Sequence, residues 1–297
     1  MKRNCWIVYN GNLKTEKFLD YAQWLAEAAR KAGITAELIA NNEILTFFQN
    51  GSCFLAGNKQ NSPLPDFVLF TDKDILLARQ IERMGIRVFN SSSAIEICDN
   101  KILMYERLAL EGIPFPKTAV SPKIFGNVTD DIHLESFTKE IGFPMVLKEA
   151  YGSFGQQVYL VSTKEELQEK IQELGSKEYI VQEFIKASSG RDIRVNIVGC
   201  RPVASMLRRS LTDFRANVSA GGTMEPYAPT KEESELAAAA ARAAGTDFAG
   251  VDLLFTEDGS PTVCEVNSNA HIRSIYSCTG INVADHILSY IKEKMYG

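Results

Sequence analysis

The chain contains 297 residues, 45% of them hydrophobic, which is enough to build two or three packed domains. Its formal net charge of −5 argues against general binding to nucleic acid or to an anionic membrane. The sequence shows neither the hydrophobic region of a signal peptide nor a run that is long and apolar enough to span a membrane. Its six cysteines form no CxxC pair, so we expect reduced thiols in a cytoplasmic protein with no nucleic-acid or membrane partner.

The first part of the chain alternates short apolar runs with helical patterns. The runs are residues 6–9, 36–39, 66–70 and 86–89, and the helical patterns are residues 15–32 and 75–84. Gly33 and Gly85 end the two helical patterns. Such alternation is typical of a parallel sheet with crossover helices, so residues 1–113 are predicted to form an α/β domain.

A second domain, residues 114–186, is predicted after a helical pattern that runs from the cap-rich residues 90–93 to Ala109. Gly112 and Pro114 stop that pattern. The second domain contains strand patterns at residues 143–148, 158–161 and 178–185 and a helical pattern at 163–174, in which Thr163 and Glu166 form a candidate capping box.

The third part, residues 187–297, has an α+β pattern. Strand patterns at residues 193–198 and 203–207 predict a hairpin around residues 199–202. Thr230 and Glu233 then open an alanine-rich helix that ends at Gly245. The predicted fold class is therefore α/β, with an α+β arrangement in this last domain.

Two acidic residues, Asp252 and Glu265, lie in strand-like runs on either side of an Asp258-Gly259 turn signal. A two-residue loop at this turn would place the two acids directly opposite each other on one face of a hairpin. Like charges so placed repel, so a positive partner is expected between them. Alternation puts Asn267 on the face of Glu265, which completes three hard oxygen ligands of the kind that Mg²⁺ prefers.

Two alternatives compete with a metal site at this hairpin. The acids could face water on an exposed surface, or a loop longer than two residues could shift the register and separate them.

Lys148 ends an apolar strand pattern and precedes a small loop, Gly152-Ser153-Phe154-Gly155. The amides of this loop could close over phosphates while the lysine supplies a point charge, although most such loops are simple turns. Lys101 could likewise be an ordinary solvated lysine, and the arginines between positions 191 and 215 could form a charged sheet edge instead of binding phosphate or carboxylate.

Several common sites are excluded by their missing motifs. The chain has no Walker loop and no Gly-x-Gly-x-x-Gly after its first strand. Its three histidines and six cysteines form no zinc-binding cluster, and Gly-x-Ser-x-Gly is missing.

Taken in chain order, these motifs resemble the ATP-grasp superfamily, most closely its RimK-type glutamate ligases. The matching segments are residues 99–101, 148 with 152–155, 181–185, 190–194, 213–217, 250–252 and 265–267. The resemblance covers residues 90–297. It implies an ATP-grasp fold with an amino-terminal parallel-sheet domain, a central lid and a carboxy-terminal metal-binding domain.

The resemblance also implies a role for each matched residue. Those near the ATP phosphates would be Lys101, Lys148, Gly152, Ser153, Gly155, Arg215 and Asn217, with Arg215 also stabilising the reacting centre. The backbone of Gln182, Glu183, Phe184 and Ile185 would contact adenine, and Asp192 would face the ribose. The ligands of Mg²⁺ or Mn²⁺ would be Asp252, Glu265 and Asn267.

The implied reaction uses ATP to activate a carboxylate as an acyl phosphate, which an amine attacks to give an amide with release of ADP and phosphate. Phosphoryl transfer depends on positioning and charge neutralisation, which lysines, arginines and metal carboxylates supply. A closed glycine loop would exclude water from the acyl phosphate. Compatible partners are small amino acids or peptides, a peptide or protein acceptor, and further copies of the chain in a homo-oligomer.

The chain departs from this family at two places. Gln157 replaces a glycine usual after the loop, and Asn269-Ala270-His271 replaces the Pro-Gly that follows the asparagine ligand in many glutamate ligases. The second change puts glutamate specificity in doubt. We hypothesise that Arg273, with Arg194 and near His271, grips a substrate carboxylate, against the alternative that Arg273 is a surface residue.

Two other functions would fit the same fold. One is a nucleotide-binding regulator without turnover, against which the retained Arg215, Asn217 and metal carboxylates argue. The other is a kinase-like transfer of phosphate to an acceptor that is not a carboxylate.

Overall fold

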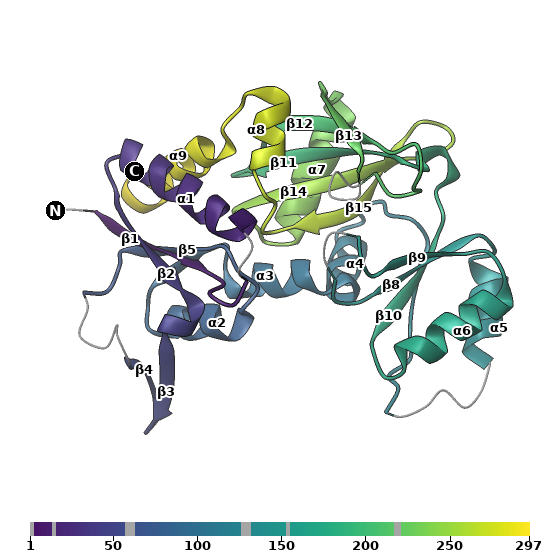
Figure 1. The fold of residues 1–297 in the computed structure, drawn as a ribbon, viewed down its shortest axis with the longest axis horizontal. Coiled ribbons are helices and arrows are strands. Elements are labelled where there is room, and N and C mark those ends of the chain that lie inside the picture. Colours follow the sequence, from purple (N-terminus) through teal and green to yellow (C-terminus); the bar gives the residue numbers. More distant parts are fainter. Residues whose placement is uncertain (1–2, 14–15, 57–62, 126–131, 153–154, 217–220) are drawn as a thin grey trace.

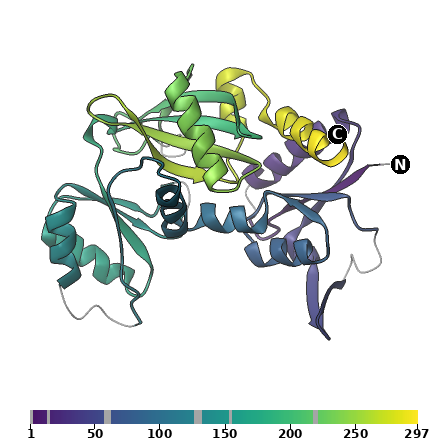
Figure 2. The same ribbon diagram turned by 180° about the vertical axis from the view of Figure 1, so that it is seen from behind.

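The computed structural model describes residues 3–13, 16–56, 63–125, 132–152, 155–216 and 221–297, and in these ranges the strands form four sheets. Figures 1 and 2 show a parallel sheet at one end of the molecule and a small antiparallel sheet with two helices at the other. Two consecutive helices, α3 (Ser92–Asp99) and α4 (Lys101–Leu110), run between these ends beneath a larger antiparallel sheet. Within the described ranges, every helix is too short or too polar to cross a bilayer.

The first sheet is the predicted parallel sheet. Its strands, in spatial order, are β2 (Thr35–Ala40), β1 (Asn4–Tyr9), β5 (Phe67–Phe70) and β6 (Arg87–Phe89), and its first helices are α1 (Glu16–Lys31) and α2 (Ile75–Arg83). All four residues of β5 are buried, as expected for a parallel strand that is covered on both faces.

A hairpin formed by β3 (Leu45–Gln49) and β4 (Ser52–Ala56) was missed by the sequence analysis. Its turn is Asn50-Gly51, and both residues have positive φ angles, of 51° and 79°. This is the residue pair that two-residue hairpins prefer, so the turn signal was present in the sequence.

The helical stretch that was predicted to run unbroken to Ala109 is two helices, α3 (Ser92–Asp99) and α4 (Lys101–Leu110). Asn100 separates them because its extended backbone ends α3 and its side chain accepts from the amide of Ile102 at 2.9 Å to start α4. Asn100 also forms a β-bridge with Tyr151. The break therefore brings the start of α4 against the loop that follows β8.

The second sheet, in spatial order, contains β7 (Thr118–Val120), β10 (Tyr179–Glu183), β8 (Met145–Glu149) and β9 (Val158–Val161), and all its pairs are antiparallel. Helices α5 (Ile132–Glu140) and α6 (Lys164–Leu174) cover one face of it (Figure 1). Thr163 caps α6 as predicted, but Glu166 reaches the amide of Ser162, one residue earlier than in a complete capping box.

The third sheet, in spatial order, contains β13 (Thr223–Pro226), β12 (Arg201–Arg209), β11 (Arg191–Val198), β14 (Phe248–Phe255) and β15 (Pro261–Asn267). The predicted hairpin of β11 and β12 is confirmed, with a tighter turn at Gly199-Cys200. Alternation along β12 sends Leu207 to the face that packs on α7 (Lys231–Ala243). Met206 points to the opposite face, towards α8 (Arg273–Thr279) and α9 (Val283–Tyr296).

The first and third sheets share a core, whereas most of the second sheet packs on its own helices. One hydrophobic cluster joins Ile7 of β1 to Met206 of β12 and Ile287 of α9. Asn90, fully buried after β6, accepts from the amides of Asp247 and Phe248 at 2.7 and 3.1 Å and donates to two carbonyl oxygens of the third-sheet region. A separate cluster holds β8 and β10 against α5 and α6. The first and third sheets therefore form one base, on which the second sheet is mounted.

The capping box predicted at the start of α7 is complete, since Thr230 accepts from the amide of Glu233 at 3.2 Å and Glu233 accepts from the amide of Thr230 at 2.7 Å. We expect Thr230→Ala to lower the free energy of unfolding by about 1 kcal/mol, because the helix loses a side-chain cap. Urea denaturation measures the change. Thr230→Ser, which keeps the hydroxyl, should retain most of the stability, and equal losses in the two variants would contradict this role.

Candidate functional site

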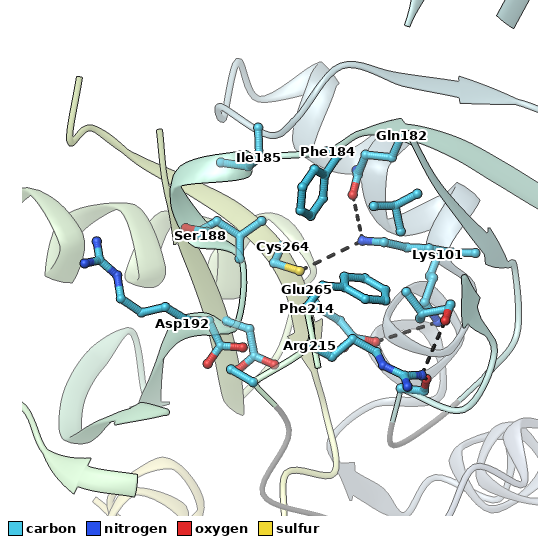
Figure 3. A pocket seen from close by; sticks show the side chains of 18 of the residues that line it. Lys101, Gln182, Phe184, Ile185, Ser188, Asp192, Phe214, Arg215, Cys264 and Glu265 are labelled. Carbon is cyan, nitrogen blue, oxygen red and sulfur yellow. Dashed lines mark hydrogen bonds and ion pairs between the residues drawn. The ribbon is translucent and has the colours of Figure 1, made fainter. Parts of the chain in front are cut away.

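A pocket lies between the second and third sheets at the start of α4 (Figure 3). It encloses about 910 Å³, including space open to solvent. The described side chains that line it include five cationic groups and four acidic ones, which are Lys101, Lys148, Arg191, Arg208 and Arg215 against Glu183, Asp192, Asp252 and Glu265. The remaining walls are largely apolar, with Val146, Phe184, Ile185, Phe214 and Leu254 among them. A flat apolar group linked to a polyanion suits such a lining.

Lys148 lies on β8 and reaches across to β10. Its Nζ donates to Gln182 Oε1 at 2.6 Å and lies 3.9 Å from Cys264 Sγ. Burial disfavours the charged form, but the acidic groups around the amine, first Cys264 and Tyr105, outweigh burial and raise the pKa of Lys148. The amine therefore lies beside the amide oxygen of Gln182 inside the pocket.

Gln182 was expected to contact adenine through its backbone, but its side chain also takes part in the site. Its side chain is buried and spans from Lys148 to Thr118 Oγ1, to which its amide donates at 2.7 Å. Glu183, Phe184 and Ile185, which follow it, do line the pocket. Sequence reasoning missed the amide that holds the lysine, because this contact depends on the antiparallel pairing of β10 with β8.

Lys101 is buried rather than solvated. Its Nζ lies 3.4 Å from the carbonyl oxygen of Gly152 and 3.8 Å from Glu265 Oε1. Its own amide donates to the carbonyl of Ala150 at 2.9 Å. The break between α3 and α4 thus sets this lysine between the glycine loop and β15.

Gly152 and Gly155 of the glycine loop line the pocket, whereas Ser153 lies outside the described residues. A Cβ atom at Gly152 would lie 2.8 Å from Gln157 Oε1, so the Gln157 side chain packs directly on this glycine. Gln157, which replaces the usual glycine, therefore packs against the start of the glycine loop.

Arg215 joins the segment between β12 and β13 to the glycine loop. Its guanidinium group pairs with both oxygens of Asp213, and its Nη1 donates to the carbonyl oxygens of Gly155 and, at 3.4 Å, Val158. Its predicted neighbour Asn217 lies outside the described residues. The side chain lines the pocket, which agrees with a place near phosphates. It also contacts Gly155 at the end of the glycine loop.

Four charged side chains on adjacent strands form a network, and three of them, Asp192, Arg208 and Asp252, line the pocket. Arg208 on β12 donates to both oxygens of Asp192 at 2.6 and 2.7 Å and lies 3.0 Å from Asp252. Arg194 on β11 donates to both oxygens of Asp252 at 2.7 and 2.6 Å. Asp192, predicted to face the ribose, is thus held by an arginine within the pocket lining. Arg194, predicted to bind a substrate carboxylate, is already paired with a carboxylate of the protein.

Burial alone would raise the pKa of Asp252, but Arg194 and Arg208 outweigh burial, and this pKa is lowered. Burial also raises the pKa of Asp192, and Arg208 offsets it only in part. The two arginines therefore keep Asp252 ionised, whereas Glu265 lies 3.8 Å from a different cation, Lys101.

Asp252 and Glu265 are directly opposite each other, as predicted, but the predicted two-residue loop is wrong. The hairpin closes with three residues, 257–259, since the amide of Thr256 donates to Ser260 O, and Gly259 has a φ of 86°. This loop shifts the register by one residue, and a bulge at Cys264 shifts it back. Because of the bulge, the consecutive residues Cys264 and Glu265 both line the pocket.

Only some of the oxygen atoms of this hairpin are available as ligands of a hard cation. Glu265 is partly exposed at the mouth of the pocket, and Asn267 uses its amide nitrogen on Gly250 O, at 3.4 Å, which leaves its oxygen as an acceptor. Both oxygens of Asp252 accept from guanidinium groups. Among the described residues, no three His, Cys, Asp or Glu side chains converge as metal ligands. Glu265 and Asn267 therefore fit magnesium, and Asp252 can join them only if an arginine releases it.

A second, wider pocket opens from the first and shares Gly152, Gln157, Arg208 and Glu265 with it. It extends to the first sheet and is also lined by Arg194, Asn267, His271 and Arg273. Arg273 forms a paired contact with Asp20 of α1, and its side chain is 61% exposed. His271 packs on Tyr21 at 5.5 Å between ring centroids. Arg273 is thus at the pocket rim in an ion pair, which any substrate carboxylate would have to replace.

Comparisons with known proteins agree with this arrangement. A family model described as the RimK-like ATP-grasp domain matches residues 98–291. The probable alpha-L-glutamate ligase 2 of Shewanella amazonensis is 39% identical over 220 residues, which cover 73% of this chain and 71% of that protein. Beta-citrylglutamate synthase B of Mus musculus is 35% identical over 223 residues, covering 74% of this chain. That match spans only 56% of the synthase.

Among solved structures, the ATP-grasp ligase PsnB in complex with a minimal precursor, Mg and ADP has a TM-score of 0.71. The match covers 99% of this chain and 98% of that one at 16% sequence identity. It supports the fold.

Replacing Asp252 tests the charge network in the protein without nucleotide or metal. We expect Asp252→Asn to lower the free energy of unfolding at pH 7 by about 3–5 kcal/mol, because Arg194 loses its carboxylate partner and Arg208 keeps only Asp192. The pKa of Asp252 is lowered in the folded protein, so its contribution is present at neutral pH and is lost as the pH falls below about 4.

Urea denaturation at several pH values measures this difference, which should narrow towards acid. Glu257→Gln, at the exposed tip of the same hairpin, serves as the control and should change little. An Asp252→Asn variant as stable as the parent at pH 7 would show that the network does not hold the sheet together.

Proposed function

The chain belongs to the RimK-like ATP-grasp family, and from this premise we propose that it is an ATP-dependent ligase that joins a carboxylate to an amine. The matched relatives are ligases that form carbon–nitrogen bonds, and PsnB was solved with Mg and ADP. The observation that carries the proposal is the union of the two pockets through Arg208 and Glu265. A nucleotide in the first pocket would direct its terminal phosphate to a molecule in the second.

Each wall of the first pocket has a place in this proposal. Phe184, Ile185 and Leu254 would hold adenine, with the backbone of residues 182–185 beside it. Lys101, Lys148 and Arg215 would neutralise the phosphates. A magnesium ion at Glu265 and Asn267, with Asp252 if an arginine releases it, would supply further positive charge there.

In the first step, a substrate carboxylate oxygen attacks the terminal phosphorus of ATP, the bond to the bridging oxygen breaks and ADP leaves. In the second step, a neutral amine attacks the carbonyl carbon of the acyl phosphate, phosphate leaves and the amine loses a proton. The cationic side chains stabilise the charge that is passed between oxygens, so a dedicated acid and base pair is unnecessary for the first step.

Water must be kept from the acyl phosphate, and the second sheet is suited to do so. We propose that residues 114–186 act as the lid, with residues 1–113 and 187–297 as the base. The lid has a core of its own, so it could move as a unit. The contact of Arg215 with Gly155 would hold the lid closed during the reaction.

Hydroxylamine provides the test, because it attacks an acyl phosphate and yields a hydroxamate whatever the natural amine is. We expect hydroxamate and ADP from a panel of carboxylates with ATP and Mg²⁺, measured by mass spectrometry. Lys148→Met should reduce the rate by about 100-fold or more, since it removes a preorganised charge. Lys123→Met, at an exposed position paired with Glu178, should leave the rate unchanged.

Two outcomes would contradict the proposal. ADP formation with a phosphorylated product and no hydroxamate would indicate a kinase. Nucleotide binding without ADP formation on any substrate of the panel would indicate a regulatory protein.

A further inference from the structure

The wide pocket reaches the first sheet at the point where its strand order reverses. β1 lies between β2 and β5, so the chain first continues to one side of β1 and later returns to the other (Figure 1). Open sheets of this kind bind ligands in the crevice at the carboxyl ends of such strands. Asn10 follows β1 and Asp72 follows β5, and both line the pocket.

Asp72 is a buried carboxylate, 8% exposed, that is held by amides. Asn10 Nδ2 donates to both of its oxygens at 3.1 Å, and Asn41 Nδ2 donates to one of them at 3.2 Å. Among the described residues, no lysine or arginine forms an ion pair with Asp72, since the adjacent Lys73 pairs with Asp99. Burial raises the pKa of Asp72, and Lys73 and the nearby Asp74 act in opposite directions on it.

Asn269, which donates to the backbone of Asp72, also has an acceptor without a hydrogen-bond partner among the described residues. Asn269 comes from the segment after β15, two residues beyond Asn267, and its Nδ2 donates to the backbone oxygen of Asp72 at 2.8 Å. Its Oδ1 is buried and has no hydrogen-bond partner among the described residues. A buried acceptor without a donor is unfavourable, so this corner of the pocket has both a negative charge and an unused acceptor.

We propose that Asp72 binds the ammonium group of the carboxylate substrate, with Asn269 as a second acceptor, so that this substrate is an amino acid or peptide with a free amino group. The inference rests on the proposed function and specifies its substrate. An ammonium group supplies a positive charge and three donors, which a carboxylate and an amide oxygen match.

The bound nitrogen is not the attacking one. The attacking amine must be neutral, whereas a carboxylate stabilises the protonated form. The ammonium group at Asp72 therefore belongs to the substrate whose carboxylate is activated at the mouth shared by the two pockets. The citryl group in the name of beta-citrylglutamate synthase has no amine, so this site would distinguish the chain from that relative.

The hydroxylamine assay tests this inference when it is run with free amino acids and with their N-acetyl counterparts. We expect the unmodified protein to prefer the free forms by about 30-fold or more in kcat/KM, because acetylation removes the buried charge pair. Asp72→Asn should lose that preference through a higher KM for the free amino acid, with the KM for ATP unchanged. Asp74→Asn is the matched control, because Asp74 shares Asn41 with Asp72 and caps α2 but does not line the pocket.

Comparable hydroxamate formation from free and acetylated acids by the unmodified protein would overturn the inference and leave the ligase function intact. That result does not depend on whether Asp72→Asn folds. An Asp72→Asn variant that folds and keeps the preference would overturn the inference as well. Hydroxamate from neither set, together with no ADP, would instead count against the proposed function itself.

Discussion

The buried charge network of Asp192, Arg208, Asp252 and Arg194 is the interaction on which the site depends. It runs across β12, β11 and β14, so each charge is held by a strand of the same sheet. Burying four charges is costly unless every one of them is paired and hydrogen-bonded, and here each guanidinium group donates to both oxygens of one carboxylate. The network leaves the floor of the nucleotide pocket close to neutral. The cations of this pocket that remain for a polyphosphate are therefore Lys101, Lys148, Arg191 and Arg215.

Two of these cationic side chains lie on the second sheet or contact it. They would therefore link binding of a nucleotide to closure of the proposed lid. Lys148 is carried by β8, whereas Arg215 comes from the loop after β12 and reaches back to Gly155. A polyphosphate between them would draw the second sheet towards the third through opposite charges. Most of the second sheet packs in a core of its own, although Ile180 of β10 also packs in the core of the third sheet and α4. Under the proposed function, binding of the nucleotide and exclusion of water would be two results of the same contacts.

The parts of the fold that could be predicted are those specified by local sequence. The parallel sheet, the capping box at Thr230 and the opposed pair Asp252 and Glu265 all follow from periodicity, cap residues and turn signals. The predicted loop length was wrong, because the hairpin closes with the three residues 257–259. Asp252 and Glu265 are nevertheless opposite each other, because the bulge at Cys264 compensates for the additional loop residue. The pairings of Arg194 with Asp252 and of Gln182 with Lys148 join strands far apart in the chain. A single sequence contains no signal for such contacts until the strand order is known.

The bulge at Cys264 separates the hairpin into two parts with different registers. Beyond it, residues 253–255 pair with residues 261–263 in one register, and before it residues 250–252 pair with residues 265–267 in the other. A change in the length of the tip can therefore be absorbed at the bulge without turning Glu265 and Asn267 to the opposite face. Deletion of Cys264 would leave the two faces unchanged, since Val263 and Val266 would stay in the core and Glu265 would stay opposite Asp252. The extra residue therefore adds one side chain to the pocket, the Cys264 thiol, whose Sγ lies 3.9 Å from Lys148 Nζ.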